Sequence, residues 1–157
     1  MTERSAHHAT FVIDRTYAAS PAQVFAAWAE PEAKARWFAG PEEWVKEAQE
    51  LDFRVGGRER LNSRPPGGPV HAFDARYQDI VPDQRIVFTY DMHLGQARIS
   101  VSLATVEFKA AGARTRMIFT EQVVFLDGYD DAGNRERGTR ELLDKLDAEL
   151  RRDRATI

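Results

Sequence analysis

The sequence predicts an α+β fold in which a curved antiparallel sheet of about seven strands packs against one long C-terminal helix. Three observations predict this arrangement. A first strand-like segment precedes two short helical segments, a run of about six strand-like segments follows, and a leucine stripe at helical spacing closes the chain. A run of strands that ends in one long helix is typical of an antiparallel sheet with its helices on one face.

The N-terminal elements are marked by β-rich composition and by prolines. Residues 11–17 are rich in β-branched and aromatic side chains and are expected to form the first strand. Ser20 and Pro21 supply an N-cap and a first-turn proline for a short helix. Pro31 ends that helix and starts a second short helix toward Trp37.

Six further strands are expected at residues 47–54, 57–64, 70–81, 85–93, 97–109 and 115–125. Gly56 and Gly57 permit a tight reversal between the first two of these strands. Alternation is clearest in the fourth of them, where four apolar side chains share one face: Ile86, Phe88, Tyr90 and Met92.

The last element is expected to be a helix over residues 135–151. Its apolar residues recur at helical spacing: Leu142, Leu143, Leu146 and Leu150. A curved sheet that packs against one amphipathic helix leaves a space between them. A ligand would bind in that space.

Composition narrows the class of protein. The chain has 157 residues and no cysteine, which excludes disulfides, thiolate zinc sites and a cysteine nucleophile. Lys and Arg number 22 against 25 Asp and Glu, so no positive surplus favours nucleic acid or an anionic membrane. Nine Phe, four Tyr and three Trp form an unusually large aromatic set. The sequence therefore predicts a soluble domain with an aromatic interior.

The ends of the chain carry no recognisable targeting signal. No stretch approaches the roughly 20 apolar residues that span a bilayer, and the first residues lack the apolar middle of a signal peptide. We expect a cytoplasmic protein without membrane insertion. Residues 10–151 are expected to form one domain, with flexible termini at 1–9 and 152–157. A homodimer through the edge strands or the exposed helix face is left open.

Several motifs together resemble a known superfamily. The segment Ser-Pro-Ala-Gln-Val-Phe-Ala-Ala-Trp at residues 20–28 precedes Trp37-Phe38. A second motif, Asp-Phe-Arg-Val-Gly-Gly-Arg, occupies residues 52–58. Residues 115–121 match a later strand. In order and spacing these resemble the SRPBCC or START-like superfamily, in the branch named after the activator of heat-shock protein 90 ATPase. The resemblance covers about residues 10–151 and implies a helix-grip fold.

Two features limit what this resemblance implies. Members of the branch usually carry Gly-Trp before the last helical stripe, whereas this chain has Gly138-Thr139. The missing aromatic enlarges the expected cavity unless Trp44 replaces it. The eukaryotic co-chaperone also has a separate N-terminal domain that contacts the chaperone, and this chain is too short to include it. A co-chaperone role is therefore not implied.

Aromatic, charged and leucine side chains are the candidates to line the cavity. Tyr77 and Tyr90 stand out because a buried hydroxyl needs a partner and can orient a ligand. The alternative, that the aromatic rings simply fill the core, stays open. The full candidate set is Trp28, Trp37, Phe38, Arg54, Tyr77, Phe88, Tyr90, Phe119, Glu121 and Leu143.

Glu121 is expected on the buried face of its strand, because its alternate neighbours are apolar. A buried carboxylate is costly unless it is paired. Arg54 is the expected partner, since the resemblance implies an arginine there beside the cavity. Three interpretations stay open: an internal ion pair, a bulge that turns Glu121 outward, or a polar anchor or general acid–base in the cavity.

Other candidate sites are weak. Arg58 and Arg60 are expected on a solvated sheet face. His71 and His93 are isolated, and although Asp91 lies two residues from His93, no third ligand is evident. No phosphate-binding loop or nucleophile elbow is present. We therefore expect no metal and no cofactor.

The leading hypothesis is the binding of a small hydrophobic or amphipathic molecule between sheet and helix. An alternative is a cavity-based enzyme of the cyclase, aromatase or dehydratase type, which the resemblance brings in and which needs an ionisable group in the pocket. A third is a chaperone partner or stress-response factor. Binding is favoured over catalysis.

Overall fold

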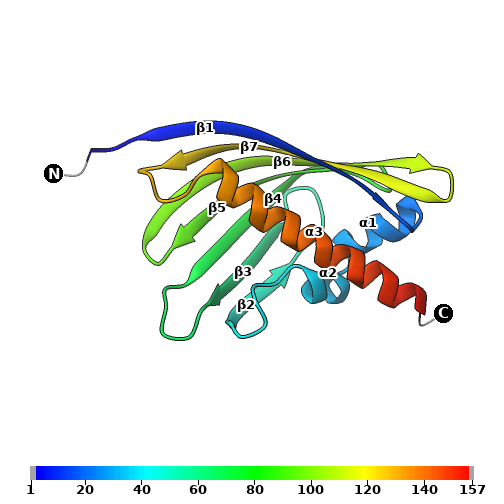
Figure 1. The fold of residues 1–157 in the computed structure, drawn as a ribbon, viewed down its shortest axis with the longest axis horizontal. Helices are drawn as coiled ribbons and strands as arrows, with labels where there is room; N and C mark the ends of the chain where they lie inside the picture. Colours follow the sequence, from blue (N-terminus) through cyan, green and yellow to red (C-terminus); the bar gives the residue numbers. More distant parts are fainter. Residues whose placement is uncertain (1–2, 156–157) are drawn as a thin grey trace.

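A seven-stranded antiparallel sheet curves around a long C-terminal helix in the computed structural model, which describes residues 3–155 (Figure 1). The predicted fold class and the helix-grip arrangement are confirmed. The strands are β1 (Ala6–Tyr17), β2 (Val45–Leu51), β3 (Arg58–Arg64), β4 (His71–Val81), β5 (Arg85–Leu94), β6 (Ala97–Ala111) and β7 (Arg114–Leu126). The helices are α1 (Pro21–Ala29), α2 (Pro31–Trp37) and α3 (Ala132–Ala155).

The sheet order is β1-β7-β6-β5-β4-β3-β2. The strands from β2 to β7 therefore form a meander, and β1, the first strand of the chain, pairs with the last strand, β7. β1 begins at Ala6, earlier than the predicted start at residue 11, because residues 6–10 pair with residues 122–126 of β7. The chain then crosses from one edge of the sheet to the other through α1 and α2. Both short helices lie beside the C-terminal half of α3 (Figure 1).

Local chemistry sets where α1 and α2 begin and end. The Ser20 hydroxyl accepts a hydrogen bond from the backbone N–H of Gln23 at 3.2 Å, and the Gln23 side chain accepts one from the Ser20 N–H at 2.9 Å. This reciprocal capping box confirms the predicted start of α1. Glu30 is extended, as expected for the residue before a proline, and Pro31 opens α2. The two helices therefore meet at a sharp corner.

The helix α3 packs on the concave face of the sheet through Leu143, Leu146 and Leu150, which are buried. It extends beyond the predicted 135–151 at both ends. At its start the Asp131 carboxylate accepts a hydrogen bond from the backbone N–H of Asn134 at 2.9 Å, which is typical of an N-cap. The Tyr17 hydroxyl donates to the Leu143 carbonyl at 3.0 Å and ties β1 to the middle of the helix. No helix within residues 3–155 is long and apolar enough to cross a membrane.

The connection between β2 and β3 is longer than the sequence predicts. β2 ends at Leu51, and the backbone then makes a compact turn in which Gly56 has a φ of +85°. A Cβ on Gly57 would lie 2.0 Å from the Asp52 carbonyl oxygen, so no other residue fits there without moving the backbone. The turn docks on β4, since the Gly56 N–H donates to the Tyr77 carbonyl at 2.8 Å.

Gly57→Ala is therefore expected to destabilise the protein by at least about 2 kcal/mol, because the added methyl group forces the turn away from β4. Urea denaturation followed by circular dichroism measures this change. Gly138→Ala in α3 is the control: a Cβ there meets nothing within 4 Å, and stability should rise by up to about 1 kcal/mol. Equal stability of the two variants would contradict the steric argument.

Candidate functional site in the cavity between sheet and helix

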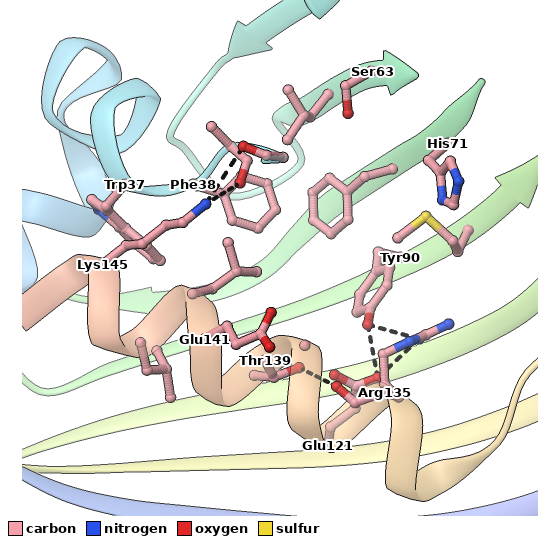
Figure 2. A pocket seen from close by; sticks show the side chains of 18 of the residues that line it. Trp37, Phe38, Ser63, His71, Tyr90, Glu121, Arg135, Thr139, Glu141 and Lys145 are labelled. Atoms are coloured by element: carbon pink, nitrogen blue, oxygen red, sulfur yellow. Dashed lines mark hydrogen bonds and ion pairs between the residues drawn. The ribbon is translucent and has the colours of Figure 1, made fainter. Parts of the chain in front are cut away.

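A cavity of about 330 Å³ lies between the sheet, α2, the segment after α2, and α3 (Figure 2). Its wall is mainly aromatic and aliphatic, with polar and charged side chains among the lining residues. Eight of the ten residues expected to line it do border it: Trp28, Trp37, Phe38, Phe88, Tyr90, Phe119, Glu121 and Leu143.

Arg54 and Tyr77 do not border the cavity. Arg54 lies in the turn after β2, its side chain is 70% exposed, and it pairs with Asp52 at 2.9 Å. The expected Arg54–Glu121 pair is therefore wrong. The physical reason is that β2 ends at Leu51, so strand alternation no longer determines where Arg54 points. Tyr77 is buried behind the wall, and its hydroxyl donates to Glu59 at 2.6 Å.

Glu121 is buried, as predicted, and its partner is Arg135 from the first turns of α3. The Oε2 atom of Glu121 accepts hydrogen bonds from the Tyr90 hydroxyl at 2.8 Å, the Ser102 hydroxyl at 2.8 Å and Arg135 Nη1 at 3.3 Å. Arg135 Nη2 also donates to the Ser100 hydroxyl at 2.7 Å. We call these five residues the Arg135 cluster; Figure 2 labels three of them, Tyr90, Glu121 and Arg135.

The Arg135 cluster is almost closed to solvent. The side chains of Glu121 and Arg135 are 1% and 9% exposed. Burial disfavours the charged guanidinium, but Tyr90, Glu121 and Asp130 more than offset this effect and raise the pKa of Arg135. Burial, reinforced by the Glu121 charge, raises the pKa of the Tyr90 phenol. The cluster therefore holds a fixed ion pair and a protonated phenol.

A second polar group, missed by the sequence analysis, lies beside α2, where Lys34 borders the cavity and its two partners do not. The Lys34 Nζ donates to Glu59 Oε1 at 2.6 Å and to the Tyr77 hydroxyl at 3.3 Å. We call these three residues the Lys34 cluster. Burial lowers the pKa of Lys34, and the Glu59 charge opposes that shift. Five aromatic rings surround the Nζ with centroids 4.8–5.9 Å away: Trp28, Trp37, Phe38, Tyr77 and Phe88.

Weak sequence signals did exist for both missed groups. Glu59 alternates with Leu61 and Ser63 along β3, and all three are buried. Arg135 is a cation near the start of a helix, where the macrodipole disfavours positive charge. A cation in that position needs a compensating partner, and the partner here is Glu121.

The side of the cavity near α3 is shaped by small residues and by Lys145. The Lys145 Nζ donates to the carbonyl oxygens of Ala39 at 3.1 Å and Gly40 at 3.5 Å, so it bridges α3 and the segment after α2 (Figure 2). Gly138 borders the cavity with open space where a side chain would be. The Trp44 ring packs on His71 with centroids 4.7 Å apart and does not border the cavity. It therefore does not replace the aromatic expected after Gly138.

The histidines do not build a metal site in the part of the chain that the structure describes. His71 borders the cavity, and burial lowers its pKa despite the nearby Asp130. His93 lies on β5 and does not border the cavity. No three His, Asp or Glu side chains of the described residues gather where they could hold a metal ion.

Comparison with known families agrees with the architecture. Residues 18–151 match the model of the family described as Activator of Hsp90 ATPase homolog 1-like protein. The chain belongs to this family. The match covers all three helices up to residue 151 and most of the sheet, and it confirms the predicted resemblance. No curated protein matches the sequence.

Several solved structures are similar to this chain over nearly its full length. An uncharacterized protein from Rhizobium leguminosarum is 54% identical, covering 96% of this chain and 99% of that chain, with a TM-score of 0.92. A protein from Rhizobium loti is 48% identical over 92% and 99% of the two chains, with a TM-score of 0.87. A Chromobacterium violaceum protein, 26% identical over 90% and 96%, has a TM-score of 0.75.

Arg135→Met is expected to lower the free energy of unfolding by about 3–5 kcal/mol, because it leaves the buried Glu121 carboxylate without its cation. Adding Glu121→Gln to this variant should restore part of the loss, since a neutral amide needs no counter-charge. Urea denaturation measures both effects. Arg137→Met, in the same helix but exposed, is the control and should change little. An equal loss of unfolding free energy in Arg135→Met and Arg137→Met would show that the Glu121–Arg135 pair does not stabilise the protein.

The three buried tyrosines predict a loss of stability in alkaline solution. Burial raises the pKa of Tyr17, Tyr77 and Tyr90 above the ordinary value of 10.0. Near pH 10 the unfolded chain releases these protons while the folded chain keeps them, so the free energy of unfolding should fall as pH rises above about 10. Phenolate absorbance of the folded protein should therefore rise sharply when urea unfolds it at that pH. Full phenolate absorbance before unfolding would contradict the burial argument.

Proposed function

We propose that the protein binds a small amphipathic molecule in the cavity, with its apolar body against the aromatic wall and a polar group at the Arg135 cluster. The observation that carries this proposal is a compact, hydrogen-bonded polar cluster at a cavity whose wall is mainly aromatic and aliphatic. Such a wall with few convergent polar groups is typical of small-molecule sites. Membership of the family, whose fold encloses such a cavity, fits the same function.

Charge at the Arg135 cluster favours a hydrogen-bond donor on the ligand. Arg135 lies 3.3 Å from Glu121 and 3.4 Å from Asp130, so one cation faces two carboxylates. Within residues 3–155, the side-chain hydrogen bonds to Glu121 all go to Oε2. Oε1 is therefore the acceptor left for a ligand. A hydroxyl or phenol fits this cluster better than a carboxylate, which would add a third negative charge.

Size favours a compact ligand. Cavities for small molecules usually span about 300–1,000 Å³. A volume of about 330 Å³ lies at the lower end of that range. It suits a molecule of one or two rings better than a long lipid or a sterol. The rings that border the cavity offer flat apolar faces to such a molecule.

The same geometry favours binding over acid–base catalysis. A general base needs a lone pair free to take a proton from the substrate. Only Oε1 of Glu121 keeps lone pairs for a ligand, and the charge of the carboxylate is already paired with Arg135. Tyr90 stays protonated because burial raises its pKa. The cluster thus resembles a preformed set of hydrogen-bond partners more than a proton-transfer site.

Gly138 provides a direct test, because filling its open space should block the cavity without disturbing either polar cluster. We expect 6-ethyl-2-naphthol, a two-ring phenol with an apolar tail, to bind the wild-type protein and raise its Tm. Gly138→Leu should remove binding while raising the Tm of the free protein, since it replaces a glycine within a helix. Isothermal titration calorimetry and thermal unfolding measure the two effects.

Gly138→Ala is the matched control, because it gives the same helical benefit with little added volume. It should still bind 6-ethyl-2-naphthol. Binding that survives Gly138→Leu unchanged would place the ligand outside the cavity. No binding by the wild-type protein of this phenol, or of a panel of one- and two-ring phenols, would contradict the proposed function.

A further inference from the structure

Two polar side chains at the ends of β3 and β4 have no hydrogen-bond partner within residues 3–155. They are Ser63, which is 7% exposed, and His71, which is half-buried. Unlike the Trp28 indole N–H, which is closed off, the Ser63 hydroxyl and the two His71 ring nitrogens keep accessible surface. Polar groups on a mainly buried face are nearly always satisfied, so this pair calls for a partner from outside the chain.

Ser63 and His71 stand side by side and face the cavity. They lie opposite each other in the register of β3 and β4, so their side chains project from the same face of the sheet. Both border the cavity, as do Leu61 and Phe73, the neighbouring residues of that face on the two strands. Figure 2 shows the pair on the same side of the sheet as Tyr90. The pair therefore reaches the cavity from strands that carry no member of the Arg135 cluster.

The neighbours of the pair hold it in place without using its hydrogen bonds. The Trp44 ring packs on His71 with centroids 4.7 Å apart, and Trp44 does not border the cavity. The cavity therefore meets the imidazole from another side. The Ser63 hydroxyl lies against Gly40, where a Cβ would come within 3.2 Å of its Oγ. The lack of a side chain at residue 40 thus leaves the hydroxyl uncrowded.

We propose that Ser63 and His71 bind a second polar group of the ligand, a neutral hydroxyl, at the end of the cavity next to β3 and β4. The inference rests on the proposed function, because this group belongs to the molecule whose first hydroxyl lies at the Arg135 cluster. A hydroxyl both donates and accepts, as do the serine hydroxyl and a neutral imidazole. One ligand hydroxyl can therefore accept from one member of the pair and donate to the other.

Charge around the pair favours a neutral group over an anion. Burial lowers the pKa of His71 below its ordinary value of 6.5, although the Asp130 charge opposes this shift, so the imidazole is neutral at pH 7.5. Within residues 3–155, the lysines and arginine that border the cavity are all engaged. Lys34 and Arg135 are in ion pairs, and Lys145 donates to backbone carbonyls. A ligand carboxylate would find no free cation there.

The pair discriminates between ligands of equal size. In the free protein, water can satisfy both side chains. A methyl group of a ligand that displaces this water leaves a hydroxyl and an imidazole without partners, which weakens binding. A ligand hydroxyl in the same place replaces the water and keeps the hydrogen bonds.

One small molecule can reach both polar sites. Phe73 follows His71 on the inner face of β4, and its ring centroid lies 4.8 Å from that of Tyr90, a member of the Arg135 cluster. Phe73 thus lies between the two sites and offers an aromatic face to the body of the ligand. A two-ring body with a hydroxyl group at each end matches this arrangement. The ligand class is therefore a compact aromatic diol.

The experiment compares 6-(hydroxymethyl)-2-naphthol with 6-ethyl-2-naphthol, which have the same shape and differ by a hydroxyl in place of a methyl group. Calorimetry at pH 7.5 should show the diol binding the wild-type protein roughly tenfold more tightly. A third compound, 6-hydroxy-2-naphthoic acid, should bind more weakly than the diol. Tighter binding of the acid would overturn the neutral ligand class.

Two variants test the pair itself. Ser63→Ala removes a hydroxyl without a partner, so its Tm should stay close to that of the wild type, and His71→Phe keeps a ring against Trp44. Each should weaken diol binding roughly threefold to tenfold and change binding of the ethyl compound by less than about twofold. Asn62→Ala is the control, because Asn62 is next to Ser63 on β3 but does not border the cavity. It should leave both affinities unchanged.

A second readout needs no variant that has to fold. In the ¹⁵N-labelled wild-type protein, the His71 ring nitrogens should shift toward one neutral tautomer when the diol binds, and not when the ethyl compound binds. Equal affinities of the wild type for the two compounds, equal weakening of both by Ser63→Ala, or unmoved His71 resonances in the diol complex would overturn the inference. Each of these results would leave the proposed function standing. No binding of either compound would contradict the proposed function and this inference with it.

Discussion

The buried ion pair between Glu121 of β7 and Arg135 of α3 is the interaction on which fold and cavity both depend. Neither charge is tolerated in the interior without the other. The pair therefore fixes the start of α3 against the sheet, while Tyr17 holds the middle of the helix through the Leu143 carbonyl. Tyr90 joins the same network from β5. One polar network thus sets the position of the helix and forms the polar end of the cavity.

The Lys34 cluster holds α2 against the sheet, as the Arg135 cluster holds α3. Lys34 lies on a helix of seven residues, too short to be stable alone, and its ammonium reaches Glu59 of β3 across the aromatic wall. With α2 and α3 each held by a buried ion pair, both walls of the cavity are anchored to the sheet through polar contacts. Apolar packing alone would favour closing a void, because lost contacts destabilise its lining. Fixed ionic anchors restrict that collapse.

Local patterns in the sequence suffice for most of the fold and for two of the five residues of the Arg135 cluster. Strand alternation is a period of two residues, so it places Tyr90 and Glu121 on the inner face before any tertiary contact is known. The partner of Glu121 is different, because it depends on where α3 starts and how it crosses the sheet. Arg54 is ruled out by a turn that begins a few residues earlier than alternation suggests. The sequence does not reveal that Lys34 is buried, because the seven residues of α2 give too little helical periodicity to define a buried face.

Different residues of the cavity control the size of the ligand and the polar groups that it must carry. Gly138 and Thr139 border the cavity from α3, with open space beside Gly138, and neither residue takes part in the ion pairs. The Arg135 and Lys34 clusters are bound into the sheet and can change only at a large cost in stability. A substitution at residue 138 or 139 therefore changes the volume available while the same hydrogen-bonding groups remain. It follows that family members which keep both ion pairs but carry an aromatic beside Gly138 would accept smaller ligands with the same pattern of polar groups.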